Sequence, residues 1–139
     1  MHADFAAVFV ALWVGHHFAD HWVQTDGQAA RKGRRDWVGR RACAAHVYWL
    51  TATQVFALVA LQFATGSVVA TPWQLLTGLA LNAATHYWID RRFTLAALCE
   101  RLGKGGFYRS GSGLGTGAYA LDQSAHLAVL FVVALVMVA

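Results

Sequence analysis

Residues 127–139 read LAVLFVVALVMVA, an uninterrupted apolar run at the end of the chain. Together with the residues from Tyr119 onward, this run is long enough to cross a bilayer as a helix. On a soluble protein it would be an exposed aggregation liability. The whole chain is 58% hydrophobic and only 13% charged, which is unlike the balance of ordinary soluble domains. The run therefore indicates a membrane protein, and a soluble helical bundle with a very apolar core is the less favoured alternative.

Three further apolar stretches precede this run, so we predict an all-α, polytopic membrane protein with four transmembrane helices in an up-down bundle. A single domain, residues 1–139, would contain helices at about residues 4–24, 42–64, 72–93 and 118–138. All eleven Lys and Arg residues fall within 31–41 and 91–109, around the connections 25–41 and 94–117. The positive-inside rule makes both connections cytoplasmic and places both termini outside a cell inner (cytoplasmic) membrane. The start MHADF lacks the basic region of a cleavable signal peptide, so the first helix is expected to stay in the membrane.

Polar pairs with a spacing of four interrupt three of the apolar stretches. They are His16 with Asp20, His86 with Asp90, and Asp122 with His126. Four residues make about one helical turn, so each pair shares a helix face. In an up-down bundle these three pairs and His46 reach the same depth, just inside the cytoplasmic boundary. The sequence therefore predicts one cluster of four His and three Asp.

Imidazole and carboxylate groups are the usual ligands of zinc, manganese and iron. We predict a site for one or two divalent ions, zinc first, with all seven cluster residues as candidate ligands. Asp20, Asp90 and Asp122 are also candidates for the general base of a hydrolytic reaction. Hydrogen-bonded His–Asp pairs without a metal, and a proton or ion pathway, are the alternatives.

Other polar residues lie beside the predicted cluster. Gln24 and Gln123 are candidates for a hydrogen bond to a metal ligand or to a substrate oxygen. His17 and His21 form a second pair with a spacing of four on a neighbouring face. Spacing alone therefore does not distinguish His16 from His17 as the ligand.

Basic residues next to a membrane bind anionic lipid headgroups. Candidates for this role are Lys32, Arg34, Arg35, Arg91 and Arg92. Trp37 among them favours a membrane surface, so the expected partners are lipids and a lipid-like substrate rather than nucleic acid. A homo-oligomer formed through the Gly and Ala residues of the third helix is compatible with the sequence.

Several motifs together resemble a known family. They are GHHFADHWVQTD at 15–26, Lys32, His46, HYWIDRRF at 86–93 and LDQSAHL at 121–127. This pattern is similar to that of the prokaryotic membrane family catalogued as domain of unknown function 3307, small polytopic proteins of bacteria and phages. The resemblance favours His16 with Asp20 over His17 with His21. The chain departs from the pattern at His21, where a Phe or similar residue is expected, and in the Gly-rich segment GGFYRSGSGLGTG at 105–117.

The resemblance also bears on function, because the family is similar in layout to membrane-bound metal-dependent hydrolases. We expect a hydrolase that acts on an amphiphilic, phosphoester-type substrate at the cytoplasmic leaflet. A metal-ion or proton transporter or channel is the first alternative, and a small phage or bacterial membrane protein without enzymatic activity is the second. The outer half of the predicted bundle has Thr, Gln and Asn but no charged residue, which is little for an ion path.

Overall fold

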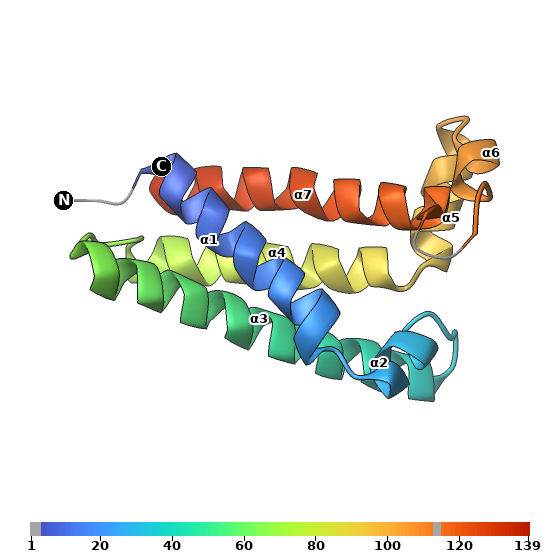
Figure 1. Ribbon diagram of the computed structural model, residues 1–139, viewed down its shortest axis with the longest axis horizontal. Helices are drawn as coiled ribbons and strands as arrows, with labels where there is room; N and C mark the ends of the chain where they lie inside the picture. The colour runs from blue at the N-terminus through green and yellow to red at the C-terminus, as the bar shows by residue number, and fades with distance from the viewer. Residues whose placement is uncertain (1–3, 113–114) are drawn as a thin grey trace.

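Four long helices run side by side along the molecule (Figure 1). The computed structural model describes residues 4–112 and 115–139, and the described residues form helices and short connections without a strand. The long helices are α1 (Phe5–Phe18), which continues into the π-helix η1 (Ala19–Val23), α3 (Trp37–Thr65), α4 (Pro72–Asp90) and α7 (Gly117–Val138). Three short helices lie in the connections: α2 (Asp26–Arg31), α5 (Phe93–Arg101) and α6 (Gly105–Tyr108). The all-helical prediction is confirmed for these residues, while residues 113 and 114 of the Gly-rich segment lie outside them.

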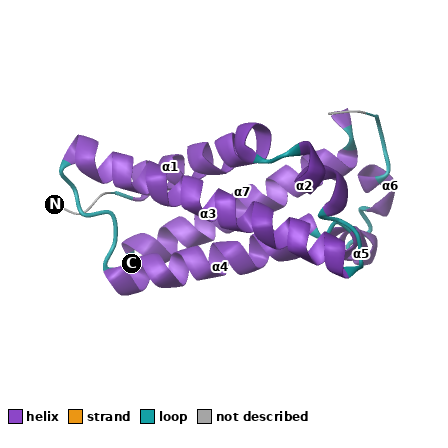
Figure 2. Cartoon of the chain, turned by 90° about the horizontal axis from the view of Figure 1, so that it is seen from below, coloured by secondary structure: helices purple, strands orange, loops and turns teal. Residues whose placement is uncertain are grey.

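The long helices form a ring in which each contacts two neighbours. Helix α1 packs against α3 and α7, and α4 packs against α3 and α7. The short helices α2, α5 and α6 gather at one end, whereas α1 begins and α7 ends at the other (Figures 1 and 2). Two helices, α3 and α7, are long and apolar enough to cross a membrane. Successive long helices run in opposite directions, so the two basic connections lie at the same end of the bundle.

Helix α3 begins five residues before the predicted position 42 because Asp36 caps it. The Asp36 carboxylate accepts a hydrogen bond of 2.9 Å from the Gly39 N–H, as N-cap side chains do. This hydrogen bond, with the neighbouring Arg34 guanidinium, holds the pKa of Asp36 below its usual range. The cap therefore extends α3 into the basic connection.

Helix α4 has a defined start and a defined stop. Thr71 and Gln74 form a reciprocal capping box at its start, followed by Pro72 in the first turn. Its end comes at Asp90, three residues before the predicted position 93, because the backbone of Arg92 has a positive φ of 56° and cannot continue the helix. This turn separates α4 from α5 and places Asp90 at the end of α4.

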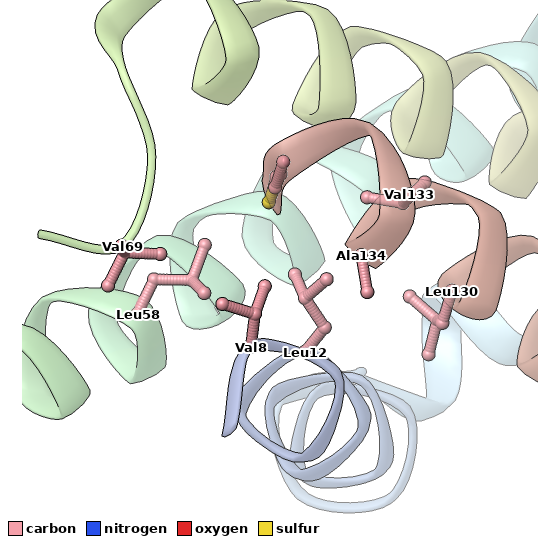
Figure 3. Close-up of a cluster of buried hydrophobic side chains, with 8 residues drawn as sticks. Val8, Leu12, Leu58, Val69, Leu130, Val133 and Ala134 are labelled. Atoms are coloured by element: carbon pink, nitrogen blue, oxygen red, sulfur yellow. The ribbon is translucent and has the colours of Figure 1, made fainter. Parts of the chain in front are cut away.

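An apolar core fills the half of the bundle away from the short helices (Figure 3). Its buried members are Val8, Leu12, Leu58, Val69, Leu130, Val133, Ala134 and Met137. Close packing and hydrogen bonds between helices stabilise a helical bundle. This core and the hydrogen-bonded pair of Gln54 and Asn82 hold the frame on which the site is built.

Gln54 and Asn82 form a hydrogen-bonded pair that joins three helices near the middle of the bundle. The Asn82 amide donates to the Gln54 side-chain oxygen at 2.6 Å, and the Gln54 amide donates to the Leu12 carbonyl at 3.2 Å. A Cβ on Gly15 would lie 3.0 Å from the Gln54 Cα, so glycine permits this close approach of α1 to α3. The Gln54–Asn82 pair therefore fixes the relative positions of α1, α3 and α4 beside the polar cluster, which includes His16.

Candidate metal centre

Polar side chains from all four long helices face one another between the apolar core and the short helices. These are His16 and Asp20 from α1 and η1, His46 from α3, His86 and Asp90 from α4, and Asp122 and His126 from α7. The four imidazoles and Asp90 are each no more than 2% exposed. The structure thus brings together all seven residues that the sequence selected.

Four donor atoms in this cluster form a four-donor set around the Nε2 atoms of His46 and His86. The His46 Nε2 is 3.1 Å from the His86 Nε2, 3.1 Å from an Asp20 oxygen and 3.3 Å from an Asp90 oxygen. The His86 Nε2 lies 3.2 Å from the same Asp90 oxygen and 3.9 Å from the Asp20 oxygen. A tetrahedral ion with ligand bonds of about 2.0–2.1 Å holds its donors about 3.3 Å apart. The Asp20, His46 and His86 atoms therefore fit three positions of one tetrahedral ion, and the Asp90 oxygen lies beside the two imidazoles.

The chemistry of these donors also fits a cation. Two neutral imidazoles whose Nε2 atoms are 3.1 Å apart need a proton or a metal between their lone pairs. One Asp20 oxygen and the Asp90 oxygen that faces the imidazoles are buried, and neither accepts an aligned hydrogen bond from the described residues. Buried polar groups without partners are costly, and a divalent ion would satisfy several of them at once.

His16, Asp122 and His126 border this four-donor set. The His16 Nε2 is 3.5 Å from Asp20, and the His126 Nε2 is 3.7 Å from both Asp90 and Asp122. Asp20, His46 and His86 form one of three groups whose donor atoms lie within 4.8 Å of one another. The other two groups are the imidazoles of His16, His86 and His126, and Asp90 with Asp122 and His126. Asp122 differs from the other members because its side chain is 22% exposed. It therefore lies where the cluster meets solvent.

Helix geometry decides which histidine of the first helix faces the cluster. His16 is buried against His86 and His126, whereas His17 is half-buried with its ring 5.3 Å from Trp13. The structure therefore places His16 in the cluster and leaves His17 outside it. His21 is exposed, and its Nε2 is 2.9 Å from the Tyr119 hydroxyl.

The two glutamines predicted beside the cluster take different positions. The Gln123 amide donates to Asp20 at 3.2 Å and to Asp122 at 3.3 Å, so it joins two carboxylates. Hydrogen bonds of this kind orient metal ligands. Gln24 lies in the wall of the adjacent pocket, and its buried amide nitrogen has no partner among the described residues. Asp20 itself lies in η1, and short π-helical segments recur at functional sites.

Lys32 is inside the site rather than on the predicted headgroup-binding surface. Its side chain is buried, and its Nζ lies 2.9 Å from an Asp90 oxygen. In the sequence Lys32 lies in a run of cations, and only the family resemblance distinguishes it from its neighbours. Only the fold of α2 over the end of the bundle turns this residue inward.

The four arginines predicted to bind headgroups also divide by burial. Arg91 is buried, with its guanidinium over the Tyr87 and Phe93 rings and donating to the Arg34 carbonyl. Arg34 pairs with Asp36, and Arg35 lies 4.6 Å over the Phe93 ring. Arg92 is exposed, donates to the Ala29 carbonyl at 3.0 Å and borders the pocket. Arg34, Arg35 and Arg92 are therefore the exposed members of this set.

A pocket of about 550 Å³ opens beside the cluster at the end with the short helices. It is lined by Asp20, His21, Gln24, Lys32, Arg92, Tyr108, Thr116, Ala118, Tyr119, Asp122 and Gln123. Carboxylate and cationic side chains therefore line one cavity. This lining suits an anionic ligand that approaches a metal ion bound in the cluster.

The tyrosines of this pocket were not predicted, because no spacing or charge pattern marks them. Burial and the nearby Asp122 carboxylate raise the pKa of Tyr108. Its hydroxyl keeps its proton at neutral pH and donates a hydrogen bond of 3.4 Å to the Arg92 carbonyl. Tyr108 follows Gly105 and Gly106 in α6, so only the path of this connection brings it to the site.

The chain matches a known family over almost its full length. The family described as protein of unknown function (DUF3307) matches residues 8–139, which contain all seven cluster residues. No curated protein and no solved structure matches the chain. The chain therefore belongs to the DUF3307 family, as its motifs predicted.

Proposed function

We propose that this DUF3307 protein is a membrane-embedded, metal-dependent hydrolase that cleaves a phosphoester-type bond in an anionic amphiphile. The observation that carries the proposal is the four-donor set of Asp20, His46, His86 and Asp90 beside a pocket lined by cations. When bound, a divalent ion, zinc first and manganese or iron next, would supply the Lewis acidity that makes water nucleophilic at neutral pH.

Membrane embedding is supported by the outer surface of the bundle. Large apolar side chains there are exposed, including Phe56 at 74%, Phe63 at 85% and Leu76 at 61%. Apolar surface of this extent indicates contact with lipid. We propose that all four long helices cross an inner (cytoplasmic) membrane, with the short helices on the cytoplasmic side and both termini outside.

The residues of the pocket would share the remaining chemistry. Asp122 is the best placed general base, because it is part of the cluster and partly open to the pocket. Asp20 and Asp90 are weaker candidates for that role, because their oxygens belong to the four-donor set. Arg92 and Lys32 would hold the anionic group of the substrate, and the Tyr108 hydroxyl would donate to it in place of the Arg92 carbonyl.

An apolar groove beside the pocket supports an amphiphilic substrate. Its volume is about 510 Å³, and its walls are Trp13, Val14, His17, Phe18, His21 and Trp22. His21 also lines the polar pocket, so the two cavities adjoin. A headgroup in the pocket would leave its acyl chain along this face of α1, within the membrane.

Transport is supported less well than hydrolysis. The interior beyond the cluster is occupied by the Gln54–Asn82 pair and then by the apolar core. A path for ions would need polar groups through this half.

The test uses the full chain purified in detergent without an affinity-tag metal, stripped with a chelator and reloaded with Zn²⁺ or Mn²⁺. Phosphate release from a short-chain phosphatidic acid and phosphoester cleavage of a short-chain phosphatidylglycerol are measured in mixed micelles. Loss of the ion, His86→Ala or Asp122→Asn should abolish turnover, and Asp26→Asn in exposed α2 is the matched control that should retain it. Full activity of the metal-free protein would refute the proposal.

A further inference from the structure

Lys32 is a cation built into the cluster. Its side chain is buried, its Nζ lies 2.9 Å from Asp90, and it also lines the pocket. The segment that carries it is held in place, since Thr25 caps α2 and Arg92 donates to the Ala29 carbonyl at 3.0 Å. Lys32 therefore has a defined position beside the candidate ligands.

Asp90 lies between Lys32 and the two imidazoles of the four-donor set. One Asp90 oxygen faces His46 at 3.3 Å and His86 at 3.2 Å, and the other faces Lys32 at 2.9 Å. In two-metal hydrolases the ions lie about 3.5–4 Å apart and both contact the reacting group. The Lys32 ammonium occupies a comparable place on the second carboxylate oxygen and borders the pocket.

The charges of the cluster balance with one divalent ion. Asp20, Asp90 and Asp122 carry three negative charges, Lys32 carries one positive charge, and metal-binding imidazoles are neutral. The net charge of minus two equals that of one divalent cation with the sign reversed. A second divalent ion would leave a buried excess of positive charge, which is costly.

We propose that the centre binds a single divalent ion and that Lys32 takes the place of a second one, holding Asp90 and the anionic group of the ligand. The inference rests on the metal site of the proposed function, but it does not depend on the reaction that the site performs. The sequence predicts one or two ions, and this inference reduces the expected number to one.

The experiment measures metal content. The full chain and its variants are stripped with a chelator in detergent, reloaded with excess Zn²⁺ or Mn²⁺, passed through gel filtration and analysed for ions per chain. Lys32→Gln removes the charge, Lys32→Arg keeps it, and Arg31→Gln removes an exposed charge from the neighbouring position. Thermal unfolding of each metal-free variant shows whether it folds.

We expect about one ion per wild-type chain, and the same for Lys32→Arg and Arg31→Gln. Lys32→Gln should rise toward about two ions per chain, because a second ion then leaves an excess of one positive charge instead of two and the ammonium no longer occupies the Asp90 oxygen. Two ions in the wild type would overturn the inference and leave the hydrolase proposal standing, even if Lys32→Gln failed to fold. A folded Lys32→Gln with unchanged content would also overturn it. One ion with no hydrolysis would refute the proposed function alone, and a wild type without an ion would refute both.

Discussion

Replacing Gln123 by Leu should weaken metal binding, because this amide orients two carboxylates of the cluster. It donates to Asp20 at 3.2 Å and to Asp122 at 3.3 Å, and the other Asp20 oxygen belongs to the four-donor set. Removal of such an outer hydrogen bond typically costs about 10- to 100-fold in metal affinity. Strong charge-assisted hydrogen bonds measure about 2.7–2.9 Å, so the longer distances here favour the lower end. We therefore expect a loss of about tenfold, equal to about 1.4 kcal/mol.

Competition for Zn²⁺ between the purified chain and a fluorescent chelator measures this affinity. Gln24→Leu is the matched control, because Gln24 lines the same pocket and has no hydrogen-bond partner among the described residues for its amide nitrogen. Its affinity should stay within about threefold of the wild type. Equal losses in the two variants, or none in Gln123→Leu, would show that the hydrogen bonds to the carboxylates do not support the ion.

Three further predictions concern the frame of the bundle. Gln54→Leu should lower the free energy of unfolding by about 1–3 kcal/mol, because the Asn82 amide and the Leu12 carbonyl lose their hydrogen-bond partner. A double-mutant cycle with Asn82→Leu in detergent should give a coupling energy of about 0.6–1.7 kcal/mol. A coupling energy of zero would disprove the pairing. Leu130→Ala empties part of the core and should cost about 2–5 kcal/mol, whereas Phe131→Ala, 48% exposed, should cost far less; equal thermal shifts would argue against this packing. The lowered pKa of Asp36 means that its ionised cap stabilises α3 above the ordinary aspartate pKa and loses that contribution as the pH falls through the folded pKa. The stability difference between the wild type and Asp36→Asn should therefore shift against the wild type below about pH 4, and a difference that does not change with pH would contradict this account.

The helices were predictable because each arises from a local pattern. The apolar run at 127–139 and the spacing of four in each His–Asp pair belong to single helices. Their ends were predicted less well where one residue decides them. Asp36 starts α3 early through a hydrogen bond to Gly39, and Arg92 stops α4 with a positive φ. Such ends depend on individual side-chain and backbone conformations that a periodicity does not contain.

The sequence by itself determined which residues form the polar cluster. Helical spacing and the alternation of the bundle place four imidazoles and three carboxylates at one depth, without any knowledge of contacts. Tertiary structure alone decided what each of them faces. It turned His16 inward and His17 outward, set Asp90 between two imidazoles and Lys32, and brought Tyr108 to the pocket. The physical reason is that spacing specifies a face of one helix, whereas a distance between donors depends on the rotation and packing of several helices.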